Sequence, residues 1–218
     1  MAAILLSTGR VKPGRYAAFV SQSAEASKLY QRLGAPPPRL MSAGFAGEAF
    51  GTWTFTVECD DLESLGALSD QFAADSDAQA FLLRLQEEAS PTTLEQVSLG
   101  IEVPLRESKG GRGSVAAVYV VKPHLGGLER TLELGGRVAA FAESQGAVNA
   151  RTFSLLGAGS GAGLYLTIFE FDSLRTYARV IDSFSTEPEG QAIAATSAGA
   201  DAPNTIVFEG VYSEMPLG

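Results

Sequence analysis

The segment Glu58-Cys59-Asp60-Asp61-Leu62 recurs 112 residues later as Glu170-Phe171-Asp172-Ser173-Leu174, and the same spacing extends far on both sides. An ungapped register of this length indicates two copies of one folding unit. The 218-residue chain is therefore expected to form two units of the size of small domains. The repeated positions are Gly34, Arg39, Ser42, Glu58, Asp60, Leu62, Asp70, Phe72 and Gln79, which recur as Gly146, Arg151, Ser154, Glu170, Asp172, Leu174, Asp182, Phe184 and Gln191.

The junction between the copies is predicted at residues 106–113. This segment is charged and rich in glycine, which is typical of an exposed, flexible linker. We therefore expect a first unit over residues 1–105, a linker over 106–113 and a second unit over 114–218.

Composition and charge exclude several classes of partner. The formal charge of −9 disfavours nucleic acid and anionic lipid, and the 16 lysines and arginines are scattered along the chain. Cys59 is the only cysteine, so no disulfide can form within the chain, and we expect it to be buried. The first residues lack the pattern of a signal peptide, and no stretch approaches the ~20 apolar residues that span a bilayer. A cytoplasmic protein without a membrane or nucleic-acid partner is expected.

Hydrophobic periodicity predicts the same order of elements in both copies. In the first copy we expect strands over 4–11, 39–44, 51–59 and 94–103, a helix over 13–33, and a split helical region over 60–88. In the second we expect strands over 115–121, 150–156, 164–171 and 205–212, a helix over 125–145, and helices beginning near 172 and 187. Asp60-x-x-Glu63 and Thr186-x-x-Glu189 have the form of capping boxes, which mark helix starts. Asp60 and its repeat Asp172 are both expected to cap a helix.

Each copy thus has the order βαββαβ with a split second helix, the pattern of a ferredoxin-like α+β unit with helices on one face of an antiparallel sheet. In the second copy both faces of the central hairpin are apolar, with Phe153 and Leu166 on one face and Tyr165 and Phe169 on the other. Both faces must therefore be buried. We expect the two tandem units to pack sheet to sheet as a single-chain α+β barrel, a pseudo-dimer within one chain.

The pattern resembles the dimeric α+β barrel superfamily, and in particular its NIPSNAP-like and antibiotic-biosynthesis-monooxygenase-like members. The resemblance rests on the split second helix at residues 60–79 and 171–191, and it covers nearly the whole chain. It implies the barrel fold and leaves further homo-oligomers open. Such folds host monooxygenases, cyclases, isomerases and haem-binding enzymes, so the resemblance alone does not decide the function.

The repeat preserves two pairs of opposite charge, Arg39 with Glu58 and Arg151 with Glu170. If each hairpin closes symmetrically, each arginine faces its glutamate across two strands. Such a pair contributes about 0.2 to 1 kcal/mol and helps to set the register. The alternative is catalytic, with the arginine holding an anionic or enolate oxygen and the glutamate moving a proton. Both interpretations stay open from sequence.

The face that carries these charges differs between the copies, with hydroxyl groups in the first and apolar side chains in the second. Apolar walls with a few polar anchors are typical of small-molecule pockets. Tyr165 is a further hydrogen-bond donor. The predicted ligand-binding residues are Met41, Thr54, Thr56, Phe153, Tyr165, Leu166 and Ile168.

His124 is the only histidine, and it stands between a predicted strand and a predicted helix at a position aligned with Gly14. A zinc or non-haem iron site needs several histidine or cysteine ligands, so no metal site and no cofactor are predicted. The resemblance leaves haem held by His124 as a minor alternative, although the superfamily's haem enzymes generally present this histidine from a helix.

The favoured function is the binding of a small, largely apolar organic molecule in the barrel lumen. Cofactor-independent monooxygenase, cyclase or isomerase activity is the enzymatic version of that function. The alternative is a non-catalytic structural or protein-interaction barrel, and haem binding through His124 is a third. The glycine-rich segment at 157–163 joins two predicted antiparallel strands and lacks the helix and lysine of a phosphate-binding loop, so a hairpin loop is expected there.

Overall fold

The computed structural model describes residues 1–45, 51–106, 110–156 and 162–217, and within them the chain has an α+β fold. The predicted glycine-rich hairpin loop lies largely outside these residues. The chain divides into two compact units. Unit 1 comprises Met1–Ile101, Leu156–Ala162 and Glu214–Gly218, and unit 2 comprises Glu102–Leu155 and Gly163–Ser213. Among the described residues, no helix is long and apolar enough to cross a membrane.

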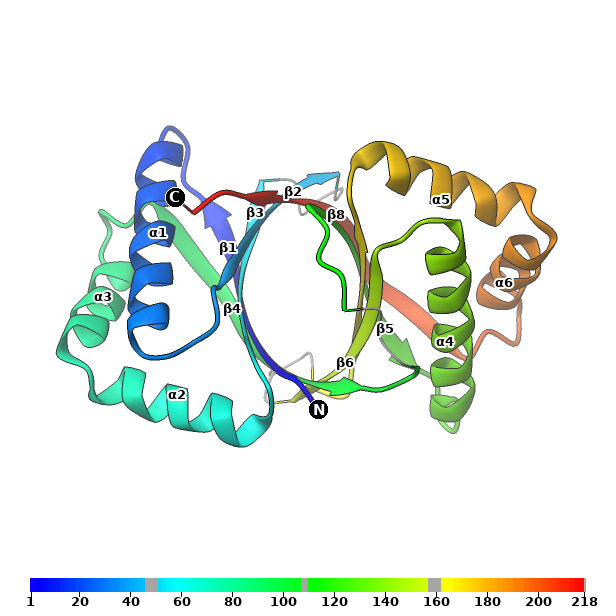
Figure 1. The fold of residues 1–218 in the computed structure, drawn as a ribbon, viewed down its shortest axis with the longest axis horizontal. Helices are drawn as coiled ribbons and strands as arrows, with labels where there is room; N and C mark the ends of the chain where they lie inside the picture. The colour runs from blue at the N-terminus through cyan, green and yellow to red at the C-terminus, as the bar shows by residue number, and fades with distance from the viewer. Residues whose placement is uncertain (46–50, 107–109, 157–161, 218) are drawn as a thin grey trace. The chain divides into compact units, whose positions relative to one another are not determined.

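Unit 1 is built on an antiparallel sheet with the strand order β4-β1-β3-β2. Helices α1, α2 and α3 lie together on one face of this sheet (Figure 1). The last residues of the chain also belong to this unit, and Met215 packs against its core. The elements are β1 (Ala3–Val11), α1 (Tyr16–Arg32), β2 (Arg39–Phe45), β3 (Thr52–Cys59), α2 (Leu62–Ala74), α3 (Ser76–Gln86) and β4 (Thr92–Val103).

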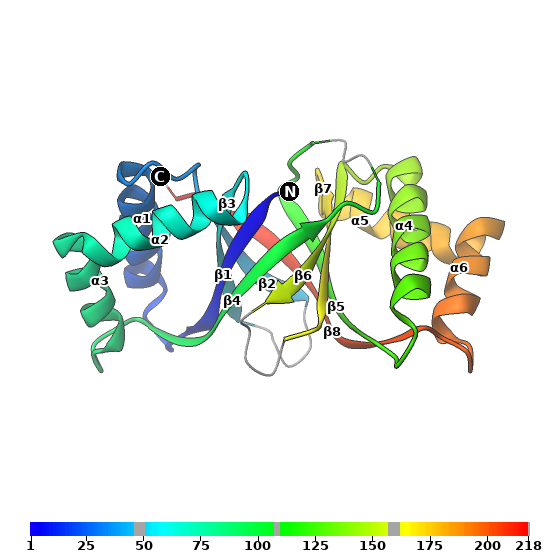
Figure 2. The same ribbon diagram turned by 90° about the horizontal axis from the view of Figure 1, so that it is seen from below.

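Unit 2 has the equivalent strand order β8-β5-β7-β6, again antiparallel. Helices α4, α5 and α6 lie on one face of this sheet (Figure 2). The elements are β5 (Val115–Pro123), α4 (Leu128–Gln145), β6 (Asn149–Leu156), β7 (Tyr165–Phe171), α5 (Leu174–Thr186), α6 (Pro188–Ala198) and β8 (Asn204–Met215). The predicted fold class and the predicted order of elements are confirmed in both units.

The 112-residue spacing holds at the level of whole elements. The pairs β1 and β5, α2 and α5, α3 and α6, and β4 and β8 each begin and end 112 residues apart. The turns after β1 and β5 also match, because Gly14 and Gly126 both have a φ of 72°, a left-handed conformation that glycine adopts without strain. His124 therefore corresponds to Lys12, and the predicted alignment with Gly14 is wrong.

Three of the predicted helix caps are shifted along the chain. The carboxylate of Asp61, not Asp60, accepts the backbone N–H of Ser64 at 2.7 Å and caps α2. Ser173, not Asp172, caps α5 in the same way. Thr186 ends α5 instead of opening α6. A side-chain oxygen caps a helix only where it reaches the free N–H groups of the first turn, which the motif alone does not locate.

The core of each unit lies between its sheet and its helices. In unit 1 the central residues are Phe19, Leu40 and Val57, and Cys59 is buried among them as predicted. In unit 2, Phe171 of β7 and Val180 of α5 fill the equivalent layer. These clusters fix which side of each strand faces the helices, and hence which side does not.

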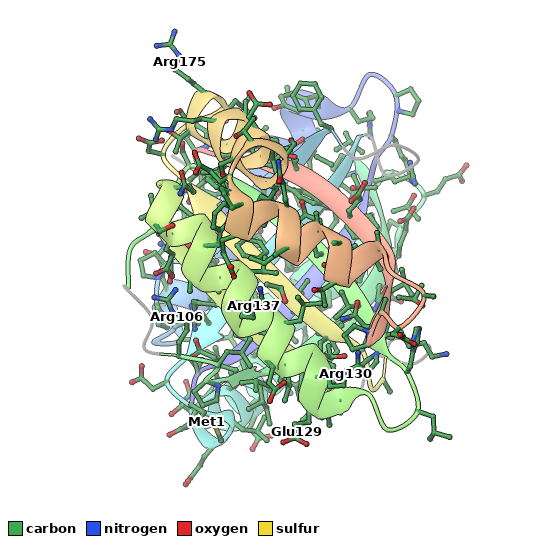
Figure 3. The ribbon with its side chains drawn as sticks, turned by 90° about the vertical axis from the view of Figure 1, so that its right-hand side faces the viewer. Met1, Arg106, Glu129, Arg130, Arg137 and Arg175 are labelled. Atoms are coloured by element: carbon green, nitrogen blue, oxygen red, sulfur yellow. The ribbon has the colours of Figure 1, made fainter. Side chains whose placement is uncertain are left out.

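The described residues of the predicted linker lie against unit 2. A Cβ at Gly113 would come within 2.3 Å of the Phe171 carbonyl oxygen, so only glycine fits there. The Arg106 guanidinium, which lies beside α4, is 2.7 Å from the Glu143 carboxylate, whose side chain is 1% exposed (Figure 3). The prediction of an exposed linker is therefore wrong for Gly113 and Arg106. Composition suggested solvent, but a buried carboxylate needs a cationic partner.

Candidate functional site

The predicted charges lie on the face of each sheet that the unit's own helices do not cover, here called the helix-free face. In unit 1, Leu40 and Phe55 pack towards the helices, so Arg39, Met41, Thr54 and Thr56 alternate onto the helix-free face. In unit 2, Phe169 and Phe171 pack towards the helices. Arg151, Phe153, Leu166, Ile168 and Glu170 consequently share the helix-free face.

The predicted opposition of each arginine to its glutamate is wrong by two residues. Arg39 lies opposite Thr56, and Arg151 lies opposite Ile168. Glu170 lies opposite Asn149 instead. Register across a hairpin depends on the length and geometry of its loop, which the repeated residues do not report.

Both arginines form bidentate ion pairs that the sequence analysis missed. In unit 1, Nε and Nη2 of Arg39 donate to the Glu214 carboxylate at 3.2 and 3.1 Å. In unit 2, the same atoms of Arg151 donate to Glu102 at 2.8 and 3.1 Å. Glu102 and Glu214 are themselves 112 residues apart, so the repeat contained a signal for them.

These pairs engage the arginines and favour their structural interpretation. A bidentate carboxylate holds a guanidinium in one orientation and neutralises its charge. The Arg151 guanidinium also lies 5.0 Å from the centre of the Phe153 ring. The Arg151 guanidinium is thus fixed within unit 2 by Glu102 and Phe153.

The two repeated glutamates have different environments. Glu58 is exposed, whereas Glu170 is only 7% exposed. A row of directly opposed residues crosses the sheet of unit 2 at Glu170, formed by Asn149, Glu170, Ala116 and Tyr212 on β6, β7, β5 and β8. All four are buried. Asn149 and Tyr212 were not predicted from the sequence. In the 112-residue register they correspond to Pro37 and Gly100, so a polar side chain at both positions distinguishes the second copy from the first.

Apolar side chains adjoin this row on the same face. Phe153 lies opposite Leu166, and both are almost fully buried. Ile168 lies opposite Val118 on the neighbouring strand. The arrangement places a carboxylate, an amide and a phenol at one end of an apolar surface, which is a suitable lining for a small organic molecule with one polar end.

Tyr165 does not belong with the other predicted ligand-binding residues. It lies opposite Ser154 and alternates with Leu166, so its side chain is on the face of the helices. In unit 1, Met41 lies opposite Thr54, and Thr56 lies opposite Arg39, so these four residues are brought together. The predicted set is therefore divided between two faces and two units.

Haem does not fit His124. The residue lies in an exposed turn after β5, and its Nε2 is 2.8 Å from the Thr205 hydroxyl. An axial ligand instead has to project into an enclosed, largely apolar cleft. Within the ranges that the structure describes, no cluster of three or more histidine, cysteine or acidic side chains is placed to hold a metal ion.

The buried tyrosines and cysteine of the helix-covered faces are not poised for catalysis. Burial raises the pKa of Tyr30 and of Tyr119 to about 12. Burial also raises the pKa of the Cys59 thiol, which keeps it protonated and a poor nucleophile at neutral pH. These groups are parts of the core.

Comparison with known proteins identifies the fold but no family. No family model matches the chain, and no curated protein matches it. Among solved structures, an anthrone oxidase-like protein superposes with a TM-score of 0.65 and 12% identity, covering 99% of this chain and 92% of that one. A predicted monooxygenase from Lactobacillus acidophilus NCFM gives 0.62 and 11%, covering 100% and 95%. A mutant chlorite dismutase from Candidatus Nitrospira defluvii gives 0.57 and 12%, covering 99% and 92%.

These similarities show that the chain shares the α+β fold of these proteins. Identities of 11 to 12% show a common fold and leave the function to be argued from this chain's own residues.

Proposed function

We propose that the chain binds a small, largely apolar organic molecule on the helix-free face of unit 2, and that Glu170 exchanges a proton with it without a cofactor. The observation that carries this proposal is the burial of Glu170 in a row with Asn149 and Tyr212, beside the apolar pair Phe153 and Leu166. A buried carboxylate is costly, and such groups are concentrated at functional sites.

The chemistry follows from the types of residue in the row. The Glu170 carboxylate would take a proton from a weakly acidic C–H bond that is conjugated to a carbonyl group, directly or through an aromatic ring, leaving an enolate-type anion on the substrate. The Tyr212 hydroxyl and the Asn149 amide can donate hydrogen bonds to the oxygen of this anion. In an isomerisation the proton returns to another carbon. In an oxidation the deprotonated carbon bonds to dissolved dioxygen, the resulting peroxide takes the proton back from Glu170, and loss of water from the hydroperoxide leaves a new carbonyl group.

The structural neighbours support an oxygenase among these versions. An anthrone oxidase-like protein and a predicted monooxygenase share the fold. Anthrone has an acidic CH₂ group next to aromatic rings, so it suits an apolar surface with one base. It is therefore the first probe to use.

The test measures dioxygen consumption and anthraquinone formation from anthrone by the purified protein and its Glu170→Gln variant. We expect the variant to lose about a hundredfold in rate, the usual contribution of a general base. Glu58→Gln is the matched comparison, because it makes the same change at the equivalent, exposed position of the first copy. An unchanged rate in Glu170→Gln would exclude the proposed base, and a loss confined to Glu58→Gln would assign the chemistry to unit 1.

A second candidate is a non-catalytic structural or interaction protein. The bidentate pairs Arg39–Glu214 and Arg151–Glu102 favour it, because they use the repeated charges to hold strands in place. This candidate predicts that anthrone neither turns over nor changes the NMR shifts of Leu166, Ile168 and Glu170. Binding without turnover would instead support a binding protein.

A further inference from the structure

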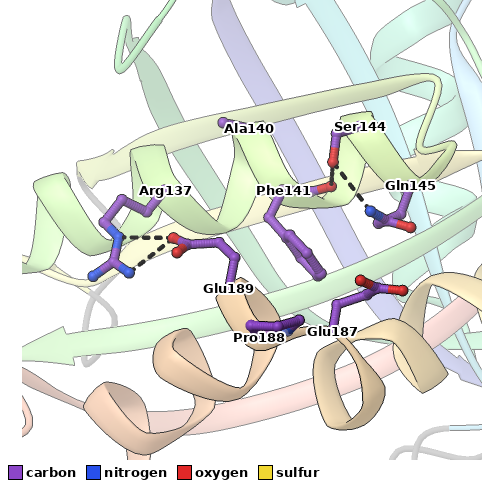
Figure 4. Close-up of a pocket in the computed structure, with 8 residues that line it drawn as sticks. All are labelled: Arg137, Ala140, Phe141, Ser144, Gln145, Glu187, Pro188 and Glu189. Atoms are coloured by element: carbon purple, nitrogen blue, oxygen red, sulfur yellow. Dashed lines mark hydrogen bonds and ion pairs between the residues drawn. The ribbon is translucent and has the colours of Figure 1, made fainter.

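An open groove of about 610 Å³ lies in unit 2 on the side of its helices (Figure 4). Phe141, Ser144 and Gln145 of α4 form one wall, and Glu187 and Glu189 at the junction of α5 and α6 form the other. The groove is a separate place from the Glu170 row, which lies on the helix-free face. Its volume is within the range of small-molecule sites.

The groove carries more negative than positive charge. Arg137 extends from α4 towards Glu189 (Figure 4), and it places Nη2 2.8 Å and Nε 3.3 Å from one carboxylate oxygen of that residue. Across the described parts of the chain, the Glu187 carboxylate has no hydrogen-bond or ion-pair partner. The groove thus contains one arginine and two carboxylates. Arg137 pairs with Glu189, and the Glu187 side chain is exposed to solvent.

The equivalent place in unit 1 contains an arginine that unit 2 lacks. Nη2 of Arg32 is 2.7 Å from Asp75 and 3.3 Å from Asp77. In the 112-residue register, Asp75 and Asp77 correspond to Glu187 and Glu189, and Arg32 corresponds to Ser144. Unit 2 therefore has both carboxylates at the start of its helix α6 but has a serine where unit 1 has the arginine.

A rearranged partner accounts for only one of the two carboxylates. The counterpart of Arg137 in unit 1 is Glu25, which pairs with Arg84. In unit 2 the arginine at this position reaches Glu189 instead. Glu187 has no such replacement, and Ser144 is too short to provide one.

We propose that this groove binds an aliphatic guanidine, with its guanidinium group beside Glu187 in the place that the Arg32 guanidinium occupies in unit 1. The planar fork of a guanidinium matches a carboxylate in bidentate geometry, which an ammonium group cannot do. A short methylene chain would lie along Phe141, and the side-chain oxygen of Gln145 offers a further acceptor. An anionic ligand is disfavoured, because both acidic side chains line the opening.

The first test is a titration of the ¹⁵N-labelled protein with butylguanidinium, followed by amide NMR shifts. We expect saturable shifts at Ser144, Gln145 and Glu187. Butylammonium should bind at least about threefold more weakly than butylguanidinium. Equal binding by the two cations would overturn the assignment to a guanidine, and the absence of saturable shifts would overturn the site.

The variants test the place of the ligand. Ser144→Arg restores the arrangement of unit 1 and should weaken butylguanidinium binding about tenfold by filling the groove from within. Ser144→Ala is the matched control, since it changes the same residue without filling the space, and the loss of binding in Ser144→Arg is measured against it. Glu187→Gln should weaken binding to a similar degree as Ser144→Arg. Unchanged binding in Ser144→Arg would refute the proposal.

The converse variant is made in unit 1. Arg32→Ser should open an equivalent groove there, so that butylguanidinium produces a second set of shifts around Asp75. Butylguanidinium should also raise the melting temperature of Arg32→Ser more than that of the unmodified protein. An Arg32→Ser variant that folds and shows no shift near Asp75 would argue against the internal comparison. None of these readouts depends on turnover at Glu170.

Discussion

Replacement of Arg106 by methionine should destabilise unit 2 because it removes a cation that faces a buried carboxylate. The Glu143 side chain is 1% exposed, and Nη2 of Arg106 is 2.7 Å from its Oε2. At a charge separation of about 4 Å and an effective dielectric constant of about 20, the attraction is about 4 kcal/mol. Arg106 is 28% exposed, so water recovers part of this loss. We expect a decrease of about 3 kcal/mol in the free energy of unfolding.

The double variant Arg106→Met/Glu143→Leu separates burial of a charge from loss of packing. When both partners become apolar, no charge remains to be buried, so the double variant should recover to within about 1 kcal/mol of the unmodified protein. Arg137→Met is the matched control on α4, the helix that carries Glu143, because the Arg137–Glu189 pair is about half exposed on both sides and should contribute less than about 1 kcal/mol.

Urea unfolding followed by far-UV circular dichroism measures these differences. Trp53 is the only tryptophan and lies in unit 1, so its fluorescence reports that unit separately. If the units unfold independently, Arg106→Met should lower the stability of unit 2 alone. The transition followed by circular dichroism should then shift to lower urea concentration, and the transition followed by Trp53 fluorescence should not. A cost for Arg106→Met no greater than that for Arg137→Met would refute the argument that the segment before the second repeat is held by a buried charge.

Four further predictions concern a helix cap, the effect of pH and the core. Ser173→Ala should lower the free energy of unfolding by about 1 kcal/mol, because Ser173 Oγ caps α5 at the Thr176 N–H, and Ser173→Asn should restore it in the same urea assay. The hydrogen bond from Arg32, and then that from the Ala78 N–H, lower the pKa of Asp75 below its ordinary 3.8, so the contribution of Asp75 to stability is present above that value and is lost as pH falls through the lowered pKa. Asp75→Asn should therefore lose stability less steeply in acid, and an unchanged acid slope would contradict this. Burial raises the pKa of Tyr30 to about 12, so this side chain stays neutral in the folded protein at pH values where unfolded tyrosine, with a pKa of 10.0, ionises. The free energy of unfolding should therefore fall as pH rises from 10.0 to about 12, and urea unfolding at high pH should show a smaller fall in Tyr30→Phe. Phe153→Ala should cost about 3 to 5 kcal/mol, since Phe153 is 1% exposed, and a cost below about 1 kcal/mol would mean that this face repacks.

The order and bounds of the elements could be predicted because they depend on local pattern. The alternation in β3 and β7 and the spacing of apolar residues in α2 and α5 are visible in the chain, and the 112-residue register supplied each prediction twice. Cys59, predicted to be buried, is buried because strand alternation places it on the same face of β3 as Val57, which packs towards the helices. The helix caps failed by one residue because a capping motif does not specify which oxygen reaches the first turn.

The candidate site was predicted less well because it depends on contacts between strands that are distant in sequence. Arg39 and Arg151 were identified, but their partners Glu214 and Glu102 lie 175 and 49 residues away. The two copies of the repeated glutamate look alike in sequence, yet Glu170 is buried and Glu58 is exposed. Tyr165 was grouped with Leu166 although adjacent residues of a strand point to opposite faces.

The sequence by itself determined the 112-residue register, the α+β class, the succession of strands and helices, and the acidic charge of this protein, because periodicity and composition act over a few neighbouring residues. Only the tertiary structure decided the strand register, the pairing of Arg39 with Glu214 and of Arg151 with Glu102, the burial of Glu170 and the groove beside Ser144. These features arise when chain segments meet in space, and the free energy of burial and of charge pairing then depends on which partners arrive.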